Sequence, residues 1–167
     1  ESENLESFTS AVIALFVAVI LMYGLLVFLY DSYLQPALVF SAVPLAFPGL
    51  FPGLFLTDNA ISFFVMLGLI GLVGIVVNNS IMLLDFINHA RKEGKGIADS
   101  AAQAVRIRFR PILTTSTTTI AGLFPLAISD PFWEGLSYSI IFGLISSSIL
   151  VLLVFPAYYA VVEKVRL

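Results

Sequence analysis

Hydrophobic residues in this sequence gather into five long runs that are separated by short polar breaks. A helix needs about 20 predominantly apolar residues to cross the hydrocarbon core of a bilayer, and each run approaches or exceeds that length. Backbone polar groups inside lipid must be satisfied within their own segment, so each run is predicted to be a helix. The predicted spans cover residues 8–30, 33–57, 60–89, 111–129 and 135–162. The predicted fold class is an all-α membrane protein.

Residues 97–109 follow a different pattern. They come after a turn marked by two glycines, and their apolar residues recur every four positions at Ile97, Ala101, Val105 and Phe109. Polar residues lie off that stripe. The pattern predicts one short amphipathic helix that lies along the membrane surface.

Proline and glycine spacing adds detail to two of the predicted spans. Three prolines repeat every four residues in the second span, at Pro44, Pro48 and Pro52. Each removes an amide donor, which predicts a bent helix. Three glycines repeat every three residues in the third span, at Gly68, Gly71 and Gly74. Such small residues allow another helix to approach closely.

Composition agrees with a membrane protein and excludes several other classes. Hydrophobic residues make up 59% of the 167 residues and charged residues only 11%, whereas soluble domains average roughly 25% charged residues. There is no cysteine and only one histidine, His89, so neither a disulfide framework nor a metal cluster is expected. No nucleophile–base pair is visible, and no basic stretch is typical of nucleic-acid binding. We therefore expect a protein that is not an enzyme, needs no cofactor and has the lipid bilayer as its partner.

The placement of charge predicts how the chain crosses the membrane. All eight Lys and Arg residues fall within residues 91–110 or at the C-terminus, and five spans put both places on one side. The other side carries acidic residues and no Lys or Arg. The positive-inside rule then predicts an extracytoplasmic N-terminus and a cytoplasmic C-terminus. Residues 1–7 would end an extracytoplasmic domain or linker, residues 8–167 would form the transmembrane part, and we expect the chain to belong to a longer protein.

Polar side chains inside two predicted spans are the candidate functional residues. Asn78 and Asn79 lie near the middle of the third span, where an unpaired amide costs a few kcal/mol. Hydroxyls at a comparable depth in the fourth span, Thr114 and Thr115 among them, are the expected partners. Each Thr can also bond its own i−4 carbonyl. Two interpretations stay open: contacts that hold helices together, or a polar lane that relays protons.

Two charged residues extend this candidate site. Asp85 follows Asn78 by seven residues and so lies on nearly the same helix face. Its position one turn from the basic loop favours an interfacial carboxylate, near His89 and Arg91, over a buried proton carrier. Arg108 points away from its basic neighbours on a helix and is the candidate for a bundle-facing role, while the neighbours are expected to anchor lipid headgroups.

The motifs together resemble a known family. Residues 71–86 (Gly-Leu-Val-Gly-Ile-Val-Val-Asn-Asn-Ser-Ile-Met-Leu-Leu-Asp-Phe) resemble the tenth transmembrane helix of resistance-nodulation-division (RND) transporters of the hydrophobe/amphiphile efflux type. Residues 93–96 and 101–110, followed by Pro-Ile-Leu-Thr-Thr-Ser, resemble that family's surface helix and the start of its eleventh helix. Residues 28–36 resemble the link between the eighth and ninth. The resemblance covers the chain from Ser7 to the C-terminus.

The resemblance implies a fold and an activity. The chain would be helices eight to twelve of a twelve-helix, proton-driven antiporter of the inner membrane that exports small amphiphilic compounds and confers multidrug resistance. Its implied partners are the N-terminal half and extracytoplasmic domains of the same pump, two further copies in a homotrimer, a periplasmic adaptor and an outer-membrane channel.

The resemblance also implies roles for single residues. Asn79, Thr115 and Arg108 match family positions that take part in the proton relay. The best-studied members carry Lys where this chain has Asn78. Because Asn cannot carry a charge, it could only hydrogen-bond the family's aspartates and could not tune their pKa as a cation would. The coupling ion is therefore open.

Two alternatives accompany this interpretation. The SecD/SecF protein-export branch shares the helix layout, although its Asp-Ala-Asn-Val-Leu-Ile signature is absent here. A membrane fragment that serves only assembly, with no transport activity of its own, is the other.

Overall fold

The computed structural model describes the backbone of residues 2–166 and the side chains of residues 6–163, and over this range the secondary structure is helical. The elements are α1 (Ser2–Tyr30), α2 (Leu34–Phe40), a 3₁₀ turn η1 (Val43–Ala46), α3 (Phe47–Leu56), α4 (Phe63–Lys92), α5 (Ile97–Ser129) and α6 (Pro131–Arg166). The five predicted spans are confirmed: five stretches are long and apolar enough to cross a membrane. They are Glu6–Tyr30, Leu34–Leu56, Phe63–Lys92, Ile97–Ser129 and Pro131–Glu163.

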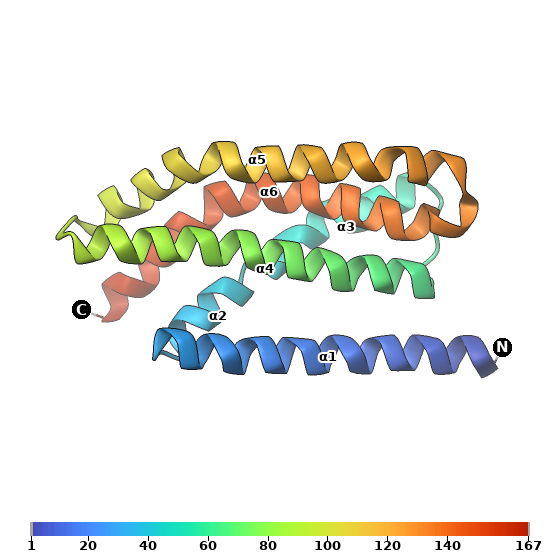
Figure 1. The fold of residues 1–167 in the computed structure, drawn as a ribbon, viewed down its shortest axis with the longest axis horizontal. Helices are drawn as coiled ribbons and strands as arrows, with labels where there is room; N and C mark the ends of the chain where they lie inside the picture. Colours follow the sequence, from blue (N-terminus) through green and yellow to red (C-terminus); the bar gives the residue numbers. More distant parts are fainter. Residues whose placement is uncertain (1, 167) are drawn as a thin grey trace.

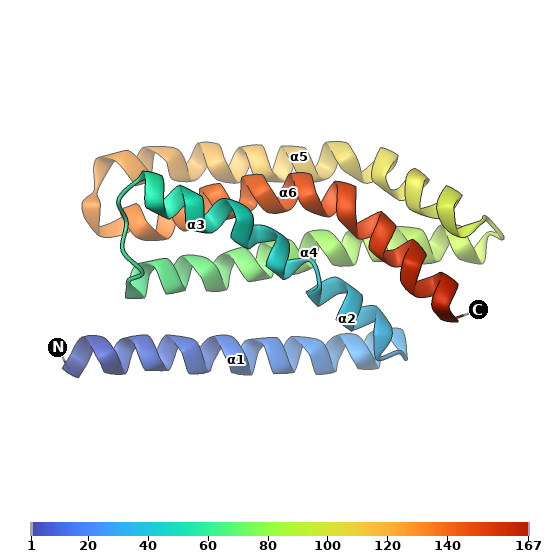
Figure 2. The same cartoon turned by 180° about the vertical axis from the view of Figure 1, so that it is seen from behind.

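The long helices run roughly along one axis (Figure 1). The α4–α5 turn, the α1–α2 link and the end of α6 lie at one end, which we call the basic end because residues 91–110 lie there. The N-terminus, the α3–α4 connection and the α5–α6 connection lie at the opposite, acidic end. Helices α4, α5 and α6 pack together, and α3 packs on α6 (Figure 2). Helix α1 stands to one side.

The second span is broken, as its prolines predict. Helix α2 ends at Phe40, two turn residues follow, and η1 leads into α3. Pro44 has no amide hydrogen to donate to the carbonyl of Phe40, so the regular ladder cannot continue through it. Pro52, in contrast, lies inside α3. The span therefore crosses the bundle obliquely (Figure 2).

The predicted surface helix is not a separate element, which corrects its predicted boundary at residue 109. Residues 97–109 form the first turns of α5, and the helix continues through Pro111 to Ser129. These turns slope relative to the rest of α5 (Figure 1), as expected for a proline bend. The predicted apolar stripe is confirmed at Ile97, Ala101 and Val105, which pack in or against the main core. It is wrong at Phe109, which is 48% exposed. The small residues Ser100, Ala101 and Ala104 are buried, so this segment packs against the bundle.

The α4–α5 turn is closed by local polar contacts. Gly94 adopts a left-handed backbone (φ 85°), which suits a residue without a Cβ. Lys95 Nζ donates to Glu93 Oε2 at 2.9 Å and to Gln103 Oε1 at 2.8 Å. Its ammonium lowers the pKa of the exposed Glu93 carboxyl. The turn is thereby fixed at the basic end.

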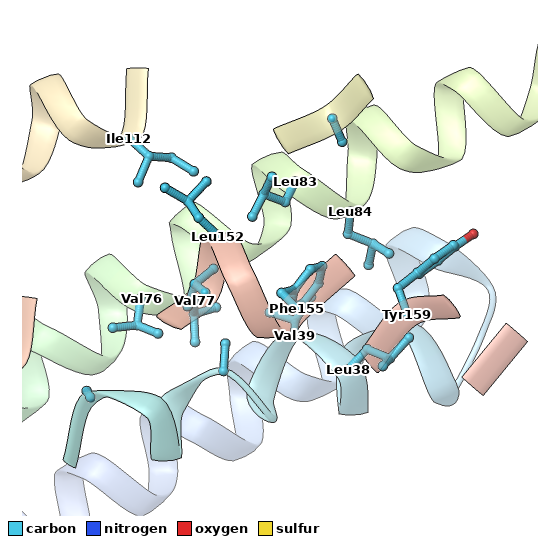
Figure 3. Close-up of a cluster of buried hydrophobic side chains, with 14 of the residues drawn as sticks. Leu38, Val39, Val76, Val77, Leu83, Leu84, Ile112, Leu152, Phe155 and Tyr159 are labelled. Carbon is cyan, nitrogen blue, oxygen red and sulfur yellow. The ribbon is translucent and has the colours of Figure 1, made fainter. Parts of the chain in front are cut away.

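The main hydrophobic core joins α2, α4, α5 and α6 toward the basic end (Figure 3). Phe155 from α6 is 1% exposed and packs among residues of the other helices. Its neighbours in the cluster include Leu38, Val39, Val76, Val77, Leu83, Leu84, Ile112, Leu152 and Tyr159. Since lipid tails are as apolar as these side chains, close packing rather than removal from water holds the helices together.

Glycines allow α6 to approach its neighbours. A Cβ added at Gly68 of α4 would overlap Ser139 of α6, and one added at Gly53 of α3 would overlap the ring of Phe142. The predicted glycine face of the third span is thus confirmed at Gly68. At Gly74 a Cβ would meet nothing within 4 Å among the described residues, so the prediction stays untested there.

Aromatic and polar contacts close the acidic end. Phe132 and Trp133, at the start of α6, contact Phe64 of α4 with ring centroids 4.3 and 5.8 Å apart. Asn59 Nδ2 donates to Glu134 Oε1 at 3.2 Å and ties the α3–α4 connection to α6. Aromatic rings at this level are typical of a membrane–water interface.

Candidate functional site: a polar seam between α4 and α5

The two mid-membrane asparagines have different environments. Asn79 is buried, at 4% exposure, whereas Asn78 is exposed on the surface of α4. Adjacent residues on an α-helix point about 100° apart, so one can face the bundle while the other does not. The prediction that both amides point into this bundle is therefore correct for Asn79 only.

Arg108 of α5 lies against Phe86 of α4, and this contact shows how the two helices are aligned along their length. Arg108 is half-buried, and its guanidinium carbon lies 5.8 Å from the ring centroid of Phe86 on α4. This contact agrees with the predicted bundle-facing position of Arg108, while Arg106 and Arg110 are exposed. The Nε atom of Arg108 is buried and has no hydrogen-bond partner among the described residues. A buried guanidinium donor without an acceptor is costly, so a partner is needed there.

The same register brings the predicted relay residues to one seam. Asn79 precedes Phe86 by seven residues, and Thr115 follows Arg108 by seven. Seven residues return to within about 20° of the same helix face and advance about 10.5 Å. The two helices run antiparallel (Figure 1), so Asn79 and Thr115 lie at similar depth, with Asn79 buried and Thr115 exposed. We call this line of Arg108, Phe86, Asn79 and Thr115 the α4–α5 seam.

The predicted hydrogen bonds between the asparagines and the threonines are not present among the described side chains. Thr115 Oγ1 donates to Pro111 O at 2.9 Å, and Thr118 Oγ1 donates to Thr114 O at 2.8 Å. These are the i−4 backbone bonds that a hydroxyl in a helix can always reach. Thr114 and Thr115 are both exposed. The hydroxyl protons of Thr115 and Thr118 are thus satisfied locally, and the Oγ1 atom of Thr115 stays available as an acceptor at the surface of this chain.

A serine pair holds α5 to α6 at the same depth. The Oγ atoms of Ser116 and Ser148 are 2.6 Å apart and buried. No sequence signal predicts this pair, because a single serine in an apolar run does not indicate that another lies opposite it 32 residues later. The pair fixes one side of α5, whereas Thr115 is left on the other.

Asp85 lies near the basic end of α4 and is exposed, as predicted for an interfacial carboxylate. Its predicted neighbours His89 and Arg91 line the same pocket as Asp85, although the ion pair of His89 among the described residues is with Glu93, at 3.5 Å. Tyr30 at the end of α1 donates its hydroxyl to Asp85 Oδ1 at 2.5 Å. The sequence separation of 55 residues leaves no local pattern that could have predicted this contact.

The arrangement defines a class of protein. The chain has five helices that can span a membrane. At membrane depth, the described residues leave amides and hydroxyls exposed and a guanidinium nitrogen without a partner. Such a pattern is typical of a multi-pass membrane transporter whose polar path is completed by other helices. Comparison with known proteins agrees with this class. The chain belongs to the AcrB/AcrD/AcrF family, which it matches over residues 1–163, and is a membrane-spanning part of an RND-superfamily efflux transporter.

Relatives and solved structures place the chain within longer proteins. It is 36% identical over 166 residues to the swarming motility protein SwrC of Bacillus subtilis (strain 168), covering 96% of this chain and 16% of that protein. It is 34% identical over 166 residues to the multidrug resistance protein MdtC of Proteus mirabilis (strain HI4320), covering 96% and 16%. The crystal structure of a heavy metal efflux pump (crystal form II) superposes with a TM-score of 0.75 at 30% identity, over 92% of this chain and 15% of that one. The chain thus spans about a sixth of these relatives.

Proposed function

We propose that this chain is the transmembrane part of an inner-membrane pump that uses the proton-motive force to export small amphiphilic compounds. The family membership supports efflux, and the relatives named as multidrug resistance proteins support amphiphilic cargo. In this proposal the protein is a transporter and catalyses no covalent chemistry.

The exposure of Asn78 at mid-membrane depth carries the proposal. An amide that faces lipid tails without partners costs a few kcal/mol. Asn78 is near the middle of the 30-residue helix α4, and its side chain accepts or donates no hydrogen bond within the described residues. The exposed side of α4 therefore needs a polar partner outside this chain. Carboxylates that bind and release protons would meet that need, because an amide can donate to the ionised form.

The seam residues take roles around that partner. Arg108 supplies a positive charge that is only partly compensated by the Phe86 ring. Thr114 and Thr115 supply acceptor oxygens, and Asn79 supplies a buried amide beside them. Asp85 lies on the same face of α4 as Asn78, at the basic end of that face. A proton that arrives on the facing carboxylates would shift their bonds to Asn78 and the seam, which would favour a different helix packing.

The partners of this chain follow from its uncovered surface. The remaining helices and the extracytoplasmic domains of the same polypeptide would cover the polar face. A homotrimer, a periplasmic adaptor and an outer-membrane channel complete the proposed assembly. The basic end faces the cytoplasm in this arrangement, by the positive-inside rule.

A heavy-metal cation is the second candidate cargo, and the similarity to a heavy metal efflux pump at 30% identity favours it. A SecD/SecF-like exporter and an assembly-only fragment remain the other classes to test against. All four are separated by what the full-length protein moves and by what drives the movement.

The experiment is transport by the full-length protein in membrane vesicles, with and without an imposed pH gradient. Export of an amphiphilic dye that collapses when the gradient is dissipated supports the proposal. Export that survives, or that requires sodium, contradicts proton coupling. Export of metal ions alone contradicts the cargo, and no export of either contradicts a pump.

Single cysteines at the two ends test the orientation. Ala60 and Glu93 are exposed in the α3–α4 connection and after α4, and this chain contains no cysteine of its own. In a full-length background without other cysteines, a membrane-impermeant maleimide added outside is expected to label Ala60→Cys and spare Glu93→Cys. The reverse pattern, or labelling of both, contradicts the proposed topology.

A further inference from the structure

A polar pocket of about 810 Å³ opens at the basic end between α1, α2, α4 and α6. Its volume lies within the range of about 300–1,000 Å³ that is typical of small-molecule sites. None of the four residues of the α4–α5 seam lines the pocket, although Asp85 on α4 does. Its walls come from the ends of four of the spans, at the level where a bilayer changes from hydrocarbon to headgroups.

Two interhelical hydrogen bonds build the pocket. Tyr30 of α1 donates to Asp85 of α4 at 2.5 Å, and Asn88 of α4 donates to Gln35 of α2 at 3.0 Å. Together they fix α1 and α2 to α4 at this end. The pocket is therefore shaped by specific contacts rather than left by loose packing.

The pocket carries separated charges of both signs that the described side chains do not pair. Asp85 and Glu163 contribute carboxylates, while Arg91 and Lys92 contribute cations. The ion pairs found at this end among the described residues join Glu93 to His89 and to Lys95. None of the four lining charges takes part in them. A ligand with one negative and one positive group would compensate both sets.

The spacing of these charges suits a short zwitterion. Asp85 and Lys92 are seven residues apart on α4, so they share a face and lie about 10.5 Å apart along the axis. A phosphate and an ammonium joined by two carbons, each with a charge-assisted contact of about 2.8 Å, bridge such a separation.

Apolar side chains at the mouth indicate that the ligand is a lipid. Leu29 lines the pocket and is 63% exposed, and Phe28 beside it is 92% exposed. The apolar surface continues along α1 toward mid-membrane depth, where Leu25 and Leu21 are 65% and 67% exposed. Acyl chains lying along α1 would cover this surface while the headgroup occupies the pocket. Pockets with cations between transmembrane helices are known sites for lipid headgroups.

We infer that this pocket binds the headgroup of phosphatidylethanolamine from the leaflet at the basic end. The phosphate contacts Lys92 and Arg91, and the primary ammonium contacts Asp85 and Glu163. Phosphatidylglycerol offers no ammonium to the carboxylates. Phosphatidylcholine has no N–H to donate to them. The inference depends on the membrane location of the chain and not on proton-driven export.

Native mass spectrometry of the full-length protein, with the three lipids added at matched acyl-chain composition, tests this site. Phosphatidylethanolamine is expected to bind best, and Lys92→Ala and Asp85→Asn are each expected to weaken its binding by about tenfold. Arg106→Ala is the matched control, since Arg106 is an exposed cation at the same end that does not line the pocket, and it should bind like the wild type.

Three outcomes overturn the inference. Equal binding of the three lipids removes the headgroup selectivity, and a preference for phosphatidylglycerol makes the site purely anion-binding. Absence of bound lipid in the wild type means that another segment of the full-length protein fills the pocket. Because binding is read directly, loss of export in any variant does not affect the result.

Discussion

Replacing Asn78 by leucine in the full-length protein is expected to slow export by about tenfold to a hundredfold without lowering the amount of folded protein. A hydrogen bond to a charged group contributes about 1.5–3 kcal/mol, and each 1.4 kcal/mol corresponds to about a tenfold change in rate. Asn78 is exposed on α4 and bonds to none of the described side chains, so leucine should leave this bundle intact. Export rate and thermal stability, measured on the same preparation, separate the two effects.

Two further variants control for this result. Asn78→Gln keeps the amide and should retain part of the activity. Thr117→Val is isosteric and lies on the flank of α5 away from Arg108 and Thr115, so it should export like the wild type. Wild-type export by Asn78→Leu would contradict a coupling role for the exposed face of α4.

Replacing Gly68 by alanine is expected to destabilise the protein by about 1–3 kcal/mol, the usual cost of overpacking. The added Cβ would overlap Ser139 Oγ and press on the backbone of Leu136, and the backbone cannot rotate away. Helices α4 and α6 would have to separate, which disturbs the core that both build. Thermal unfolding of the full-length protein in detergent measures the change.

The matched control is Gly24 of α1, one turn before the exposed Phe28 and away from the face of α4 that carries Asn78. A Cβ at Gly24 meets nothing within 4 Å, so Gly24→Ala should be neutral or stabilise by up to about 1 kcal/mol through helix propensity. Equal destabilisation by both variants would mean that glycine flexibility, and not the close α4–α6 contact, explains Gly68.

The sequence predicts those parts of this fold that depend on composition and local rules. Five apolar runs give five spans because lipid admits few other backbone arrangements. Pro44 predicts a break in the second span because the missing amide is a local property. Pro111 did not end α5, although the rule for Pro44 applies equally to it. Small residues pack in the same core before both prolines, Ala42 before Pro44 and Ala101 and Ala104 before Pro111, so local sequence does not distinguish them.

The sequence likewise predicts only part of the candidate site. Polar residues in apolar runs are enough to identify Asn78, Asn79, Thr114, Thr115 and Arg108 as candidates. Which amide is buried depends on helix rotation, and the contact of Arg108 with Phe86 settles it. The bonds of Tyr30 and Gln35 could not be predicted, because each joins residues more than 50 positions apart.

The proposed coupling requires that Asn78 faces polar groups of the same protein outside these 167 residues. A photoreactive aliphatic amino acid placed at position 78 of the full-length protein, followed by peptide mass spectrometry, tests this placement directly. Cross-links to transmembrane segments elsewhere in the same polypeptide are expected, while the same probe at buried position 79 should cross-link to α6, since Leu72 on the same face of α4 lies against Gly143 of α6. Adducts of position 78 with lipid alone would contradict the placement and, with it, the proposed coupling.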